Sequence, residues 1–172
     1  MQEIRGVGRA VACVLFVFAA AANARQSAPL VDRSGIAVFN RTFTEAIRSM
    51  NNEAVLSLWE DDGIALLPDT KPVLGKPAMR TMLQTISSAH PKAEMKYFTN
   101  ECFDVAGSGP WASEWCLEHQ VVSEPGKPTF DSWGKMLLVL HRQPSGEWRL
   151  VREMWNQGAH SERPPLAGSE VH

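Results

Sequence analysis

The stretch that decides the fold is DSWGKMLLVLHRQPSGEWRLVREMWN, residues 131–156. Its first arm, residues 135–142, is mostly Leu, Val and Met, which suits a central strand that is covered on both faces. Its second arm, residues 147–156, alternates in residue type and also predicts a strand. The turn Pro-Ser-Gly at residues 144–146 joins the arms into a hairpin. Because a two-stranded hairpin is barely stable alone, earlier segments must cover it. Strict alternation sets one face of the second arm against the other: Arg149, Val151, Glu153 and Trp155 against Trp148, Leu150, Arg152 and Met154.

The segments before this hairpin predict two helices, a strand, a third helix and two more strands. Apolar residues recur every three or four positions in the helices, with Asn52 as the expected N-cap of the second. This order is typical of an α+β fold, in which three N-terminal helices pack on a curved, mostly antiparallel sheet. Rolled around the helices, the sheet makes a cone-shaped barrel with an interior pocket. The predicted helices are residues 35–50, 53–59 and 75–88, and the predicted strands are 64–67, 93–106 and 111–122.

The two ends of the chain differ from this domain. Arg5 and Arg9 precede an apolar run over residues 10–22, and Ala22-Asn23-Ala24 supplies small residues for cleavage. This pattern predicts a signal peptide and a periplasmic or secreted protein without a membrane segment after cleavage. The alternative is an uncleaved anchor. The predicted organisation is a signal peptide at 1–24, a flexible lead-in at 25–34, one domain at 35–158 and a disordered tail at 159–172.

Charge and motifs exclude several function classes. The chain has 172 residues and a formal net charge of −2, which becomes −3 when two Arg and one Glu leave with residues 1–24. No Lys/Arg run is present, so the sequence does not predict nucleic-acid binding. No two His residues have metal-ligand spacing, and no Ser or Cys lies in a nucleophile motif. We therefore expect no metal and no cofactor.

Three stretches resemble the SnoaL-like branch of the nuclear transport factor 2-like superfamily. They are NEAVLSLWEDDG (52–63) with GKPA (75–78), GPWASEWC (109–116), and GKMLLVLHRQ (134–143) with GEWRLVREMWN (146–156). Their order and spacing carry the resemblance, which spans about residues 35–157. It implies a cone-shaped α+β barrel that is often dimeric and holds a pocket between helices and sheet. It implies little about chemistry, because this fold hosts enzymes, binding domains and non-catalytic relatives.

The residues argue against the mechanism of the ketosteroid isomerases in this superfamily. Those enzymes carry a general-base Asp directly before a Pro, and the matching position here is Leu67, before Pro68. A leucine cannot transfer a proton, so this mechanism is not expected. Asp69 fits a solvated turn, and the pair Asp61-Asp62 fits a helix end.

Glu114 is the candidate catalytic residue. It lies in the middle of a predicted strand, between Trp111 and Trp115. Inside the cone, it would have a raised pKa and could act as an acid or base. Trp111, Trp115 and Leu117 share the opposite face of the strand, and that face is the more apolar one. This favours an outward-facing Glu114, whereas the resemblance favours a Glu114 that faces the interior. The sequence leaves this open.

The predicted ligand-binding residues combine aromatic and polar side chains. Aromatic side chains dominate apolar ligand sites, and this domain holds six tryptophans. The predicted set is Trp59, Glu114, Trp133, Lys135, Arg152, Trp155 and Asn156. Two functions follow: an exported domain that binds a small, mostly apolar molecule, or a cofactor-independent isomerase, cyclase or dehydratase that uses Glu114. A third is a dimeric scaffold whose pocket is filled by its own side chains.

Cys102 and Cys116 are predicted to form a disulfide between adjacent strands. In an antiparallel register that opposes them, the turn centres on Gly109. The same register sets Asp104 opposite Glu114, an unfavourable pair of like charges. Two free thiols are the alternative, and an oxidising compartment favours the bridge. We also expect a homodimer that packs through the outer face of the sheet, because its long hairpins carry many aromatic residues.

Overall fold

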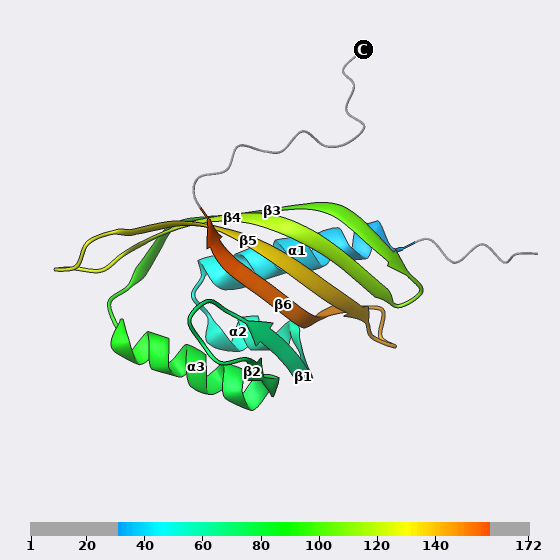
Figure 1. Cartoon of the computed structure of the whole chain (residues 1–172), viewed down its shortest axis with the longest axis horizontal. Helices are drawn as coiled ribbons and strands as arrows, with labels where there is room; N and C mark the ends of the chain where they lie inside the picture. The colour runs from blue at the N-terminus through cyan, green and yellow to red at the C-terminus, as the bar shows by residue number, and fades with distance from the viewer. Residues whose placement is uncertain (1–30, 159–172) are drawn as a thin grey trace, which may run out of the picture.

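The computed structural model describes residues 31–158, so the predicted signal peptide at 1–24 and tail at 159–172 lie outside it. The described chain forms one α+β unit of three helices and six strands (Figure 1). In chain order, these are α1 (Arg33–Arg48), α2 (Asn52–Ser57), β1 (Trp59–Leu66), β2 (Val73–Leu74), α3 (Gly75–Ala89), β3 (Glu94–Ser108), β4 (Trp111–Ser123), β5 (Phe130–Arg142) and β6 (Trp148–Gly158). None of the helices within residues 31–158 is long and apolar enough to span a membrane.

Helix α1 begins earlier than its apolar pattern predicts, because Asp32 caps it. The Asp32 carboxylate accepts hydrogen bonds from the backbone N–H of Gly35 at 2.9 Å and from the Ser34 hydroxyl at 2.7 Å. The bond from Gly35 satisfies a backbone N–H that the first turn of a helix leaves without a partner. The predicted lead-in therefore ends before Arg33, which is already helical. The spacing correctly predicted the buried face, which consists of Ile36, Phe39, Phe43 and Ala46.

The second helix is shorter than predicted. Its cap is Asn51 rather than Asn52, and the Asn51 side chain accepts a hydrogen bond from the backbone N–H of Ala54 at 3.0 Å. The helix ends at Ser57, and Trp59 is already the first residue of β1. Of the three predicted helices, α1 and α3 are therefore long, with 16 and 15 residues, whereas α2 has six.

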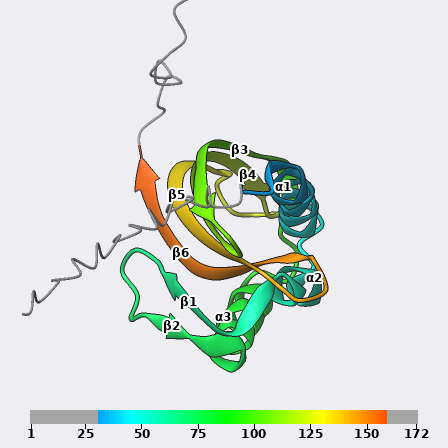
Figure 2. The same ribbon diagram turned by 90° about the vertical axis from the view of Figure 1, so that its right-hand side faces the viewer.

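The strands form one six-stranded sheet in the order β2-β1-β6-β5-β4-β3. All neighbours are antiparallel except β1 and β6, which are parallel. The hairpin that decides the fold is β5–β6, and it occupies the centre of this sheet. The sheet is curved, and the helices lie on one side of it (Figures 1 and 2). We call the side that faces the helices the inner face and the opposite side the outer face. The core lies between the inner face and the helices, where Leu138, Leu140 and Leu150 are fully buried.

A β-bulge in β6 changes which side chains face inward. Leu140 pairs with Leu150, but Val139 pairs with Arg152, so Val151 is an extra residue on β6. Strict alternation therefore fails at this point. Trp148 and Leu150 point inward before the bulge, and Glu153 and Trp155 point inward after it; Arg152 and Met154 are exposed.

The β3–β4 hairpin pairs Cys102 with Cys116, and the structure places a disulfide between them. Their Cα atoms are 4.0 Å apart. The predicted register does not continue to Asp104, which has a positive φ of 53° and lies in a bulge between Phe103 and Ala106. The bulge shifts Ala106 opposite Ser113, so Asp104 and Glu114 do not form the like-charge pair that an uninterrupted ladder predicts.

Candidate functional site

The inner face of β4 carries two buried carboxylates. Strand alternation places Ala112, Glu114, Cys116 and Glu118 on this face. Glu114 is 2% exposed and Glu118 is 7% exposed. Buried carboxylates are normally paired with a cation, yet no Lys, Arg or His within residues 31–158 forms an ion pair with either. The interior of the sheet therefore contains acidic groups without a compensating positive charge.

Glu114 lies inside, which settles the question that the sequence left open. The Asn40 side-chain nitrogen of α1 donates a hydrogen bond to Glu114 Oε2 at 3.0 Å, and Oε1 has no partner in the described chain. Burial raises the pKa of Glu114, and the Asn40 hydrogen bond offsets part of this effect. Its carboxylate lies close to both sulfurs of Cys102 and Cys116. Because these cysteines are joined in a disulfide, they offer no thiolate to a metal.

Glu118 on β4 interacts electrostatically with a further acid of the inner face, Glu153 on β6. Glu153 pairs with the buried Leu138 and so shares its inner face. Burial raises the pKa of each carboxyl to about 7, and the charge of Glu118 further raises the pKa of Glu153. Glu153 is partly exposed, and loss of hydration at its carboxyl group is the main cause of the raised pKa. Each carboxyl group therefore gains or loses its proton near neutral pH.

Trp155 lies beside this pair because Gly134 leaves room for its indole ring. A Cβ atom at Gly134 would clash with the indole nitrogen of Trp155. Since Gly134 is the partner of Glu118 in the β4–β5 ladder, the ring extends across β5 toward Glu118. The indole N–H lowers the pKa of Glu118 against the larger effect of burial, although the two groups do not form a hydrogen bond of normal geometry.

Other buried polar atoms on the inner face have no hydrogen-bond partner in the described chain. These are both side-chain polar atoms of Asn100, Ser132 Oγ and Trp155 Nε1. Asn100 lies opposite Glu118 in the β3–β4 ladder, and Ser132 lies opposite Gln120 in the β4–β5 ladder. Most buried polar groups in proteins are hydrogen-bonded, so a cluster of exceptions needs an explanation. We call these inner-face residues, which occupy four successive rows of the sheet, the polar ring; its members are Asn100, Glu118, Ser132, Glu153 and Trp155.

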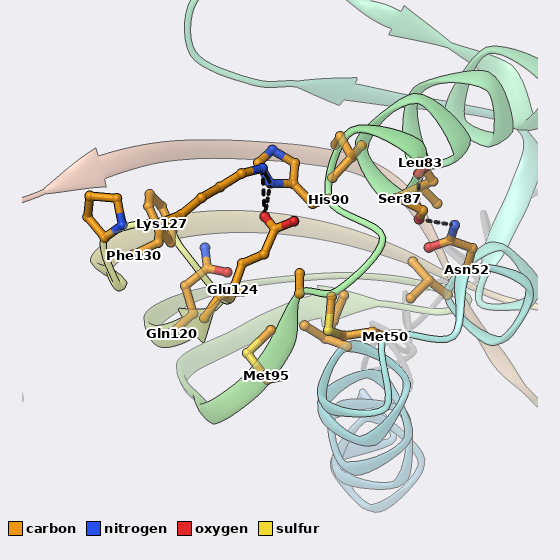
Figure 3. A pocket seen from close by; sticks show the side chains of 16 residues that line it. Met50, Asn52, Leu83, Ser87, His90, Met95, Gln120, Glu124, Lys127 and Phe130 are labelled. Atoms are coloured by element: carbon orange, nitrogen blue, oxygen red, sulfur yellow. Dashed lines mark hydrogen bonds and ion pairs between the residues drawn. The ribbon is translucent and has the colours of Figure 1, made fainter.

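A cavity of about 530 Å³ opens next to the polar ring, between the helices and the ends of β3, β4 and β5 (Figure 3). Gln120 and Phe130 line the cavity and lie two residues from Glu118 and Ser132, on the same faces of their strands. Two residues along a strand span about 7 Å, so Glu118 and Asn100 lie one row of side chains below the cavity, whereas Trp155 and Glu153 lie two and three rows below it. The cavity is lined by Ile47, Met50, Asn52, Val55, Leu83, Ile86, Ser87, His90, Ala93, Met95, Gln120, Val122, Glu124, Lys127, Pro128 and Phe130.

A fourth acidic residue, Glu124, forms ion pairs, whereas Glu118 forms none with the described chain. Its carboxylate contacts Lys127 Nζ and His90 Nδ1, each at 2.8 Å (Figure 3). The hydrogen bonds from Lys127 and His90 lower the pKa of Glu124. This residue is therefore a charged group on the cavity wall, with its charge compensated by its neighbours.

Four of the predicted ligand-binding residues lie on the outer face, away from the cavity. Lys135 and Asn156 pair with each other across β5 and β6, and Trp133 is stacked on His119 with ring centroids 3.9 Å apart. Arg152 pairs with Val139 on the same face. The bulge at Val151 and the parity of β5 explain these errors: residues 133 and 135 alternate with the buried 132, 134 and 136. These four residues are not part of the interior site.

The remaining predicted residues have structural roles. Trp59 is 4% exposed and belongs to the core. Asp69 lies in an exposed turn with a positive φ of 54°, as predicted. Asp61 pairs with Lys76 at 2.9 Å, but Asp61 and Asp62 lie within β1 and do not end a helix, so that prediction was wrong. His119 pairs with Asp131 at 2.9 Å and not with Glu118, as the alternation of strand residues predicts.

Sequence reasoning missed the residues of the polar ring except Trp155. The signal for Glu118 was its parity: it is four residues from Glu114 and must share its face. Glu153 is two residues from Trp155 and likewise shares its face. Asn100 and Ser132 gave no comparable signal, because their role depends on the register between strands.

No family model matches this chain, and no curated protein matches it. Solved structures do match. A ketosteroid isomerase-like protein from Erwinia carotovora atroseptica superimposes with a TM-score of 0.64 at 16% identity, covering 74% of this chain and 96% of that one. A conserved protein from Planctomyces limnophilus gives a TM-score of 0.64 at 20% identity, with 74% and 98% covered. An NTF2-like protein with a cystatin-like fold from Novosphingobium aromaticivorans gives 0.58 at 19% identity, with 81% and 84% covered.

At these identities the likeness concerns the fold. The chain has the nuclear transport factor 2-like fold, also called cystatin-like, in agreement with the resemblance of its sequence to the SnoaL-like branch. This fold supports many unrelated activities, so function must be argued from the site.

Proposed function

We propose that this chain binds a small, mostly apolar molecule between the helices and the inner face of the sheet. The observation that carries the proposal is the cavity of about 530 Å³, a size suited to a small ligand. Most of its lining side chains are apolar, and the lining comes from the three helices, the start of β3 and the turn end of the β4–β5 hairpin. The polar ring below supplies the few polar groups that orient a ligand in such sites.

The unpaired atoms of the polar ring support binding rather than simple packing. A scaffold whose pocket is filled by its own side chains would satisfy its buried polar groups internally. Here Ser132 Oγ and both polar atoms of Asn100 have no partner in the described chain. A bound molecule would supply these hydrogen bonds.

An enzyme is the second candidate, with a different acid from the one the sequence favoured. Glu114 is hydrogen-bonded to Asn40, and it does not line the cavity. Glu118 and Glu153 have pKa values of about 7, which suit a general acid or base at neutral pH. Proton transfer at this pair would need no cofactor. Turnover that is lost in both Glu118→Gln and Glu153→Gln, while ligand affinity is kept, would establish this function.

Filling the cavity tests the binding proposal. The probe is the fluorescent apolar dye 1-anilinonaphthalene-8-sulfonate, titrated against the folded protein. Ala93→Trp places a large side chain in the cavity and should weaken binding at least about tenfold. Val38→Trp is the matched control, because Val38 lies on the exposed side of α1 and does not line the cavity; it should leave affinity unchanged. Equal affinity for both variants, or no binding by the parent protein, would contradict the proposal.

We further propose that the protein is a homodimer that packs through the outer face. Exposed apolar side chains gather there, among them Tyr97, Leu137 and Met154. Partly buried aromatic rings lie between them, including the stack of His119 on Trp133. Light scattering at micromolar concentration should give twice the mass of the chain, and a monomer would contradict this proposal.

Export is proposed on the sequence pattern of residues 1–24 and is supported by the disulfide, which persists in oxidising compartments. N-terminal sequencing of the protein from the producing cell should find Arg25 first. A chain that still begins at Met1 would contradict cleavage.

A further inference from the structure

We infer that Lys127 and His90 form a subsite for a carboxylate, so that the ligand of the cavity is an acid with an apolar body. This inference rests on the proposed function, because it assigns the polar end of a ligand in the same cavity. Its basis is the pair of contacts that Glu124 makes, the exposure of its two partners and the apolar side chains around them (Figure 3).

The charge of the cavity wall is the first argument. Among the described residues that line the cavity, His90, Glu124 and Lys127 are the titratable ones. Glu124 contributes −1 and Lys127 contributes +1, so the lining has no net charge while the imidazole is neutral and a charge of +1 when it is protonated. A cationic ligand therefore finds no net attraction at this wall, whereas an anionic ligand is attracted when His90 carries a proton.

The hydrogen bonds within this group leave two positions for a ligand. His90 Nδ1 and Lys127 Nζ contact the same oxygen, Glu124 Oε2, each at 2.8 Å. A ring nitrogen without a proton would repel this carboxylate, so Nδ1 donates its N–H and Nε2 is left without a partner in the described chain. The longer approach of Lys127 Nζ to Nδ1, at 3.3 Å, is then not a hydrogen bond.

Lys127 keeps a spare donor as well. Its ammonium group has three N–H groups, of which one donates to Glu124 and one to the backbone carbonyl of Ala89 at 3.4 Å. The third N–H and a protonated His90 Nε2 are two donors, and a carboxylate accepts from two such donors at once.

Exposure decides which of these groups a ligand meets. The side chains of His90 and Lys127 are 51% and 48% exposed, whereas that of Glu124 is only 11% exposed. A ligand in the cavity therefore meets the imidazole and the ammonium group, and the less accessible acid holds both of them in place.

The rest of the lining suits an apolar body. Met50, Ile86 and Phe130 line the cavity and are exposed, although they are large apolar side chains. Such side chains gathered at one place indicate an apolar partner. Asn52 and Ser87, which are polar, are hydrogen-bonded to each other at 2.9 Å.

The other charged groups near the cavity place the anionic end of the ligand at Lys127. Glu94 and Lys96, at the start of β3, pair with each other and do not line the cavity, and the lining residues of α1, α2 and β3 are uncharged. Glu118 lies one row of side chains below the cavity, where its ionised form would repel an anion. The carboxylate of the ligand is therefore expected beside Lys127, with the apolar body inside the cavity.

Three ligands with one ring system test this inference: 1-naphthylacetate, 2-(1-naphthyl)ethanol and 2-(1-naphthyl)ethylammonium. Calorimetry at about pH 6 should show the carboxylate binding about three- to tenfold more tightly than the alcohol, and the ammonium compound binding no more tightly than the alcohol. At about pH 8.5 the preference for the carboxylate over the alcohol should shrink, because imidazoles lose their charge between about pH 5 and 8. Near pH 7, binding of the carboxylate should take up protons, since an anion favours the imidazolium form.

Neutral variants separate the subsite from the rest of the cavity. Lys127→Met and His90→Gln should each reduce the carboxylate preference about threefold and leave the affinity for the alcohol within about twofold. His90→Gln should also abolish the proton uptake, which Lys127→Met should keep. Lys92→Met is the matched control, because Lys92 is exposed in the turn after His90 and does not line the cavity; it should keep the preference. Circular dichroism and thermal melting verify that each variant is folded.

The outcomes distinguish the two proposals. Alcohol or ammonium binding that equals or exceeds carboxylate binding at pH 6 overturns the carboxylate subsite and leaves the apolar cavity standing. The same conclusion follows if the carboxylate preference survives in both Lys127→Met and His90→Gln, or if Lys92→Met reduces it as much as they do. If none of the three compounds binds, the proposed function itself fails, and the subsite fails with it.

Discussion

The two faces of β4 differ in a way that reverses the usual relation between burial and polarity. The inner face carries Glu114 and Glu118, both buried, with a disulfide between their positions. The outer face carries aromatic and apolar side chains, including Trp111, which is 46% exposed. A sheet that served only its own stability would place the aromatic face against the helices. The difference supports the proposals of a mostly apolar ligand with a polar end at the inner face and of a partner at the outer face.

The arrangement has an energetic consequence. Burying a carboxylate without a cation is costly, and the protein reduces this cost by keeping the carboxyl groups protonated up to neutral pH. The fold is stabilised elsewhere, by the apolar core between α1 and the centre of the sheet. Natural proteins accept such unfavourable local features mainly at functional sites.

The largest expected effect is a difference in stability between substitutions at two neighbouring residues of β5, one on each face of the sheet. Leu138 points inward and is fully buried, whereas Leu137 points outward and is 47% exposed. Leu138→Ala should lower the free energy of unfolding by about 2–5 kcal/mol, because it leaves a cavity in the core. Leu137→Ala should change it by less than about 0.5 kcal/mol in a monomer. Urea denaturation of both variants checks this; similar losses would mean that the outer face is as well packed as the inner one.

The disulfide is expected to have the next largest effect, because it ties β3 to β4 beside the buried acids. Replacing Cys102 and Cys116 together with Ala should lower the free energy of unfolding by about 3 kcal/mol, in proportion to the loop it closes. Chemical denaturation with and without reductant provides the measurement. Reductant should destabilise the parent protein and leave the double variant unchanged. A parent protein that is insensitive to reductant even when unfolded would mean that the bridge does not form.

A smaller effect, dependent on pH, is expected from Glu118→Gln. The pKa of Glu118 is raised to about 7 in the folded protein, from 4.5. Between these values the folded protein binds more protons than the unfolded chain, so stability falls as pH rises and levels off above about 7. Because glutamine remains neutral, the variant should match the parent protein below pH 4.5 and exceed it by about 1–3 kcal/mol at pH 8. Thermal melts of the parent protein and the variant at pH 4.5 and pH 8 measure this difference. A variant that is less stable than the parent protein at pH 8 would contradict this account.

The sequence predicted the central hairpin, the buried face of α1 and the α+β class, because these depend on local periodicity. It failed where a single backbone irregularity changes the parity of a strand. The bulge at Val151 moved Arg152 outward and Glu153 inward, and no local sequence pattern predicts an inserted residue of this kind. The bulge at Asp104 likewise removed the expected contact with Glu114.

The candidate site was harder to predict than the fold, because it is made by register between strands. Trp155 was recognised from its residue type alone. Its neighbour Glu118 comes from another strand and meets the indole only because position 134 between them is a glycine. Polarity also misled the prediction: Lys135 and Asn156 looked suited to orient a ligand, but they alternate with the inward positions and lie on the outer face.

The most direct test of the acidic interior is a titration of the individual side-chain carboxyl groups by carbon-detected nuclear magnetic resonance. Glu118 and Glu153 should have midpoints near 7, and Glu124, paired with Lys127 and His90, should have a midpoint below 4.5. In Glu118→Gln, the midpoint of Glu153 should fall, because the like charge that raises it is gone. Midpoints near 4.5 for both Glu118 and Glu153 would contradict the account, since the two groups would then be ordinary solvated carboxylates.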